Sequence, residues 1–172
     1  MLARRRFLQV GLAGVALLGV ARLMQRPEMP AYFRVLDGGS APLIRALVPV
    51  VLAGSLPTRE PERDVAIQEV VEAFDRAVAG LTPAVQGEID DLLGVLCFGP
   101  TRLVLTGLWT PIEMAGGEEI AQFLTRWRTG RFDLLRAGYQ ALTQLIQASW
   151  YDNPTAWAVI GYPGPPQMPG RS

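Results

Sequence analysis

The chain has 172 residues, 49% hydrophobic and 19% charged, which indicates one globular domain plus a short targeting segment and excludes a disordered or polytopic membrane protein. Because histidine is absent, a Ser-His-Asp triad, a Cys-His dyad and imidazole ligands for zinc or haem are excluded. Cys97 is the only cysteine, so an iron–sulfur cluster, c-type haem attachment and an internal disulfide are excluded too. The only basic run is N-terminal, which argues against nucleic-acid binding.

The net charge of zero is distributed unevenly along the chain. Residues 1–34 carry six arginines against one acid, a net charge of +5, and the remaining residues carry ten arginines against fifteen acids, a net charge of −5. This asymmetry is typical of a short basic leader that precedes an acidic body.

The N-terminal segment has the layout of an export signal. Basic residues precede an apolar run of twelve residues, 10–21. It resembles a twin-arginine signal, in which a pair of arginines is followed by one variable residue and then by two apolar residues. The residues that carry this resemblance are Arg4, Arg5, Phe7 and Leu8. We therefore predict that residues 1–26 direct the chain through the twin-arginine translocase to the periplasm. The alternative is an ordinary signal anchor in which the Arg-Arg pair occurs by chance.

The fate of this signal has two alternatives. Gly19-Val20-Ala21 fits a small-x-small cleavage site. The apolar stretch from Phe7 to Ala21 would span about 22 Å as a helix, less than the roughly 30 Å hydrocarbon core, but flanking arginines can snorkel. A retained signal would therefore anchor the body to the inner membrane, and either alternative places the body in the periplasm.

Helical periodicity follows a Pro-rich linker at 27–40. We expect a helix from about Pro42 to Ala53, capped by Ser40 and kinked or ended by Pro49. The clearest helical pattern is one apolar face formed by Ile67, Val70, Val71, Phe74, Val78 and Leu81.

Five further segments extend the pattern. Thr82-Pro83 is expected to start a helix that Gly99-Pro100 stops, and the apolar stretch 103–105 is either a buried helical turn or a short strand. Three more helices are predicted, with one at about 120–130, one at about 132–150 with Phe132 on its apolar face, and a short one at about 155–160. The predicted fold is an all-α, compact bundle of five to seven helices over 41–161. It has an N-terminal signal or anchor helix and an extended Pro-rich tail at 162–172.

Candidate chemistry within the body is sparse. The adjacent pairs Asp90-Asp91 and Glu118-Glu119 diverge on a helix, which favours solvated faces over a metal or catalytic site. We expect Cys97 to be a buried thiol. Arginines 126, 128 and 131 are interpreted as solvated charges near a helix end, with an acidic docking patch as the alternative. No catalytic, cofactor-binding or metal-binding residue is predicted in this chain.

The C-terminal block is the most informative part of the sequence. Four large aromatic residues fall within thirteen positions, and a Pro-Gly turn and a Pro-Pro segment follow them. Either the first three aromatics fill the end of the bundle or the whole block docks on a partner, and docking is favoured for the rigid tail. The candidate docking residues are Trp150, Tyr151, Trp157, Tyr162, Pro163, Gly164, Pro165 and Pro166.

This block resembles the C-terminal signature of the small subunits of flavin-dependent membrane-bound dehydrogenases, the gluconate 2-dehydrogenase subunit 3-like family. The segment Arg131–Arg136 resembles the helix that leads into that signature, and the leader fits the same family. The resemblance covers about residues 1–22 and 118–166. It implies a non-catalytic small subunit whose partner is a large subunit that carries FAD in a glucose-methanol-choline-type fold, with a cytochrome c subunit as a further expected partner.

The leader and the sparse chemistry agree with this implication. The twin-arginine route exports folded, cofactor-loaded proteins, yet no cofactor-binding residue is predicted in this chain. The signal is therefore interpreted as an escort for a partner that folds around FAD in the cytoplasm. The alternative is a structural, membrane-anchoring subunit of another periplasmic complex.

Overall fold

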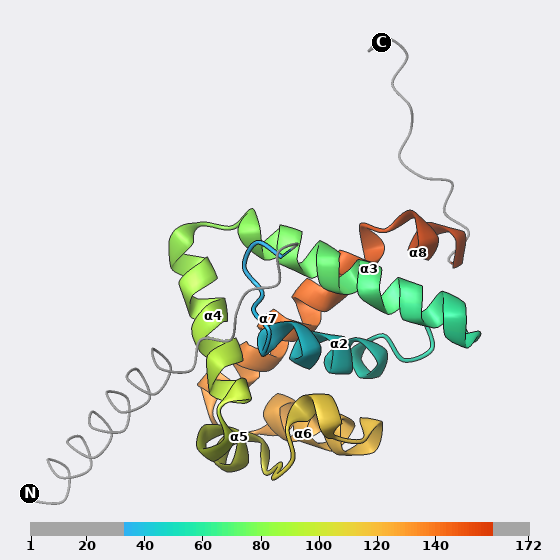
Figure 1. The fold of residues 1–172 in the computed structure, drawn as a ribbon. Helices are drawn as coiled ribbons and strands as arrows, with labels where there is room; N and C mark the ends of the chain where they lie inside the picture. Colours follow the sequence, from blue (N-terminus) through green and yellow to red (C-terminus); the bar gives the residue numbers. More distant parts are fainter. Residues whose placement is uncertain (1–32, 160–172) are drawn as a thin grey trace, which may run out of the picture.

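The computed structural model describes residues 33–159, and this part of the chain is all-helical with no strand (Figure 1). This confirms the predicted all-α class for the described residues. The predicted signal and the tail at 162–172 lie outside them. The elements are α2 (Ser40–Val51), α3 (Glu60–Ala79), α4 (Pro83–Cys97), α5 (Gly99–Thr106), the 3₁₀ turn η1 (Ile112–Met114), α6 (Gly117–Thr129), α7 (Asp133–Tyr151) and α8 (Pro154–Val159).

Helix α2 lies at the centre of the bundle, between α3 on one side and α6 on the other (Figure 1). Its apolar residues Leu43, Ile44, Leu47 and Val48 are fully buried. The largest buried side chains of the surrounding helices are Phe74, Phe123, Trp127 and Trp150. None of the described helices combines the length and the apolar character that crossing a membrane requires.

A buried carboxylate attaches the segment before α2 to α3. Asp75 is 2% exposed, and its two oxygens accept the backbone N–H groups of residues 34, 35 and 36 at 2.8, 2.8 and 2.9 Å. Leu36, which the sequence places in the linker, is 1% exposed and packs in the core. Asp75 therefore pairs the backbone donors of residues 34–36 and holds this segment against the bundle.

The start of α2 differs from the predicted one. The helix begins at Ser40 itself, and the capping carboxylate belongs to Asp37, which accepts the N–H groups of Gly39 and Ser40 at 3.0 and 2.7 Å. Ser40 supports this turn, because its hydroxyl donates to the Asp37 carboxylate at 2.7 Å. The prediction that Ser40 caps a helix from about Pro42 was therefore wrong, since the helix begins two residues earlier and Ser40 belongs to it. Pro49 lies inside the last turn, and α2 continues past it to Val51, so this proline does not stop the helix at its own position.

The junction between α4 and α5 confirms where α4 stops and shows that a further helix begins there. α4 ends at Cys97, and Gly99-Pro100 opens α5, since proline is tolerated in the first turn of a helix. The stretch 103–105 is helical but only partly buried, because Leu103 and Leu105 are half-buried whereas Val104 is 82% exposed. The buried members of α5 are polar. Arg102 donates to the carbonyls of Cys97 at 3.2 Å and Trp109 at 3.3 Å, and so ties α5 to both of its neighbours.

Helix α7 follows the predicted pattern except at its start. Leu142 and Ile146 are buried as expected, whereas Phe132 lies just before the helix and is 71% exposed. Its backbone is extended, so its side chain does not follow the helical periodicity that the sequence pattern assumed.

Two helical glycines allow a matched test of the packing. A Cβ at Gly138 on α7 would lie 3.1 Å from the Trp127 ring and 3.3 Å from Leu92, whereas a Cβ at Gly87 on α4 would meet nothing within 4 Å. We expect Gly87→Ala to raise the free energy of unfolding by about 0.5–1 kcal/mol, because alanine favours the helix. Gly138→Val should lower it by about 1–3 kcal/mol through overpacking. Urea unfolding followed by circular dichroism measures both, and a stabilised Gly138→Val variant would contradict this contact.

Candidate functional site

The C-terminal aromatic block spans the end of α7 and α8, and its side chains differ in exposure. Trp150 is 1% exposed and belongs to the core, whereas the next residue, Tyr151, is 51% exposed. Trp157 is half-buried against the core, and its indole Nε1 donates to the carbonyl of Tyr151 at 2.8 Å. The packing interpretation therefore fits Trp150, and Tyr151 is the exposed residue among these three.

An Asn-Pro turn attaches this block to α3. The side-chain amide of Asn153 donates to Glu69 Oε2 at 2.6 Å, and its backbone N–H donates to the carbonyl of Trp150 at 3.0 Å. α8 then begins at Pro154, one residue before the predicted start at about 155, because proline fits the first position of a helix. These bonds place the start of α8 beside the N-terminal half of α3 (Figure 1). The predicted docking residues 162–166 lie outside the described residues.

The acidic pairs lie on solvated helix faces, as expected. Asp90, Asp91, Glu118 and Glu119 are exposed. The pair on α6 occupies the first turn, where carboxylates favour the helix dipole, and Glu119 Oε2 accepts the N–H of Gly116 at 3.0 Å. Within residues 33–159, no three Asp, Glu or Cys side chains gather as a metal site would require. Cys97 is half-buried and packs against the core.

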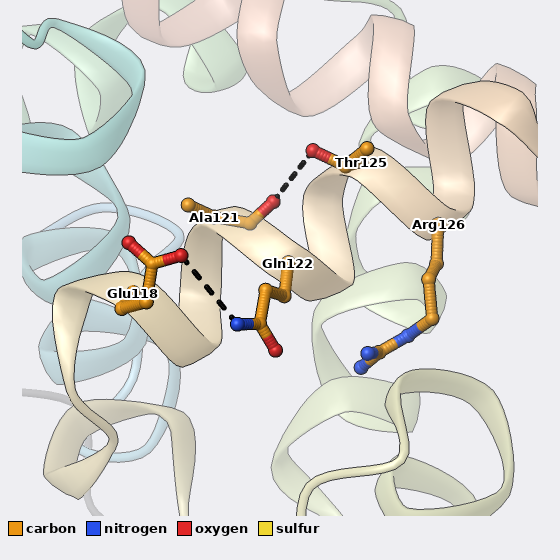
Figure 2. Close-up of a pocket in the computed structure, with 5 residues that line it drawn as sticks. All are labelled: Glu118, Ala121, Gln122, Thr125 and Arg126. Carbon is orange, nitrogen blue, oxygen red and sulfur yellow. Dashed lines mark hydrogen bonds between the residues drawn. The ribbon is translucent and has the colours of Figure 1, made fainter.

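A shallow hollow of about 300 Å³ follows the exposed side of α6. It is lined by Glu118, Ala121, Gln122, Thr125 and Arg126. Figure 2 shows the side chains of Glu118 and Gln122, which are linked by a 3.4 Å hydrogen bond, with the Arg126 guanidinium separate from this pair. The guanidinium of Arg126 donates to the carbonyl of Thr106 at the end of α5. The hollow is therefore one face of a single helix, and its charged groups do not converge on a common point.

The ends of α5 and α6 and the start of α7 meet at one corner of the molecule (Figure 1). Two side chains of α6 make this junction. Arg126 bonds Thr106, and the Trp127 indole donates to the carbonyl of Leu105 at 2.8 Å. Trp127 is 1% exposed, and the arginines at 126, 128 and 131 are exposed around it, as the interpretation of solvated charges expects.

This corner also exposes apolar side chains. The sequence analysis placed Phe132 on the apolar face of its helix and did not single out Trp109 or Leu134. Trp109 is 82% exposed, Phe132 71% and Leu134 81%. The sequence signal was present but ambiguous. Leu134 and Leu135 are adjacent, and only the position of the buried face decides which of them is covered. Exposed aromatic and aliphatic residues beside arginines are typical of interaction surfaces.

The chain was compared with known proteins at the levels of family, sequence and structure. No family model matches it, no curated protein is detectably similar in sequence, and no solved structure matches its fold.

Proposed function

We propose that this chain is a non-catalytic small subunit that escorts a folded, FAD-containing dehydrogenase subunit of the glucose-methanol-choline type through the twin-arginine pathway. In the periplasm it stabilises that partner. The observation that carries the proposal is the combination of a twin-arginine-like leader, Arg4 to Leu8, with the C-terminal Trp-Tyr … Gly-Tyr-Pro-Gly-Pro block.

The described body supports a binding role more than a catalytic one. Its acidic pairs are solvated and lie on separate helices, α4 and α6, so they do not form a pair of carboxylates for acid–base chemistry. The aromatic block instead contains the exposed Tyr151, which ends α7. α8 follows it and precedes the Pro-rich tail in the sequence. Exposed tyrosine and a polyproline segment dock at a low entropy cost.

The docking role of the tail predicts a specific binding defect. Truncation after Gly161 removes Tyr162 and the following prolines, and we expect it to weaken binding of the flavoprotein about thirtyfold. Loss of one buried aromatic anchor commonly costs about 2 kcal/mol or more, which corresponds to that factor. Truncation after Pro166 is the matched control, because it keeps Tyr162–Pro166 and should bind normally.

The measurement is a pull-down of a flavin dehydrogenase encoded beside this chain, with circular dichroism of each variant in parallel. Equal recovery of the partner by both truncated chains would contradict the docking role. A loss of helicity after truncation at Gly161 would show that the tail completes this chain's own fold.

A further inference from the structure

An exposed apolar protrusion lies where α7 begins. Phe132 is 71% exposed and Leu134 is 81% exposed, although both are apolar and stand next to well-packed helices. We call these two residues the knob. The segment is held in place at its base, because Arg136 donates to the carbonyl of Gly130 at 2.6 Å and also bonds Asp133. The knob is therefore an ordered surface on a fixed backbone.

The surroundings of the knob are positively charged. Residues 126–136 carry four arginines and one acid, a net charge of +3, within a body whose other charge is mainly acidic. Arg128 and Arg131 are exposed, and no ion pair within residues 33–159 involves either of them. An apolar knob with exposed arginines fits a partner surface that is apolar and acidic.

A surface with these properties lies on the same chain, at the start of α3. A groove of about 470 Å³ is lined by Pro57, Pro61, Glu62, Val65, Ala66 and Glu69. Val65 is 59% exposed in it, and the only charged lining groups are two carboxylates. Residues 59–72 carry five acids and two arginines, a net charge of −3.

The knob and the groove of one molecule lie too far apart to meet. Phe132 precedes the first residue of α7, whereas Asn153, just beyond its last residue, bonds the groove residue Glu69 at 2.6 Å. A helix of 19 residues is about 28 Å long. The two surfaces therefore lie near opposite ends of α7, and only a second molecule can bring them together.

We propose that two copies of this chain associate by placing the knob of one copy, Phe132 and Leu134, in the Pro57–Glu69 groove of the other. The exposed arginines beside the knob then face Glu62 and Glu69. Apolar burial supplies the attraction, and the opposite charges select the register. A second copy carries the complement of each surface, an acidic groove for the knob and a basic, apolar knob for the groove.

Cross-linking of full-length chains tests this contact. Two differently tagged copies, both carrying Cys97→Ala, are produced in the same cells, one with Val65→Cys and the other with Leu134→Cys. A short bismaleimide should join the two tags at least ten times more efficiently than it joins two copies with the same cysteine. Val85→Cys, which is 39% exposed on α4 and belongs to neither surface, is the matched control.

A charge exchange tests the register without altering an apolar contact. Glu62→Arg in the Val65→Cys copy should lower the yield of the mixed cross-linked product about tenfold, because the new arginine would face Arg131 of the other copy with a like charge. Arg131→Glu in the other copy should restore the product. Both side chains are exposed, so neither change alters the core.

Two results would overturn the proposal. The first is the absence of a mixed cross-linked product although both cysteines react with a maleimide dye. That result would mean that the two surfaces bind a membrane, another protein or the chain's own tail. The second is a product between two Leu134→Cys copies that exceeds the mixed one, which would indicate a symmetric contact through the knobs.

Discussion

Replacing Arg4 and Arg5 together by lysine should leave both this chain and its flavoprotein partner in the cytoplasm. The twin-arginine translocase recognises the arginine pair itself, so a change that keeps the charge removes recognition and leaves a basic N-terminus. The partner is proposed to travel on this signal, and its periplasmic amount should fall at least tenfold. Fractionation of cells, with immunoblots of both subunits and dehydrogenase activity in each fraction, measures the effect.

The control for this experiment replaces Arg22 and Arg26 by lysine, since both lie beyond the motif and keep their charge. Export should then be normal. If the Arg4→Lys, Arg5→Lys chain stays in the cytoplasm while active partner still reaches the periplasm, the escort role is wrong. The chain would then fit the alternative role of a structural, membrane-anchoring subunit.

Asp75→Ala should destabilise the body more than any other single change at a polar residue discussed above. It removes three hydrogen bonds to backbone donors at residues 34, 35 and 36, and leaves the donor of the buried Leu36 without its acceptor. Hydrogen bonds to a charged group contribute about 1.5–3 kcal/mol each, and they are not additive. We expect a loss of about 3–5 kcal/mol, a large part of the roughly 5–15 kcal/mol that stabilises a typical domain.

Urea unfolding followed by circular dichroism measures this loss, with two variants for comparison. Asp64→Ala removes an exposed carboxylate on the same helix, 3.9 Å from Arg45, and should change the stability by less than about 0.5 kcal/mol. Asp75→Asn keeps the shape and one acceptor oxygen, so it should fall between the other two. A loss for Asp75→Ala no larger than that for Asp64→Ala would show that residues 34–36 contribute little to the fold.

The periodic segments of the sequence predicted helices well where one face is clearly apolar. The face from Ile67 to Val78 is buried in α3, and the end of α6 falls at Thr129, next to Gly130. The errors lie at helix starts. α3 begins at Glu60, before its apolar stripe becomes regular, and α5 begins at the Gly-Pro pair that was expected to end α4. Proline is compatible with the end of one helix and the first turn of the next, so the local signal is ambiguous.

The sequence by itself determined the all-helical class, the basic leader, the chemistry excluded by the absence of histidine, and the location of the aromatic block. These conclusions depend on composition and on short-range spacing, which are the same whatever the chain packs against. Only the tertiary structure decided that Trp150 is core and Tyr151 is surface, that Asp75 holds residues 34–36, and that Leu134 is exposed beside the half-buried Leu135. Each of these depends on which neighbour covers a face, and contacts between distant residues decide that.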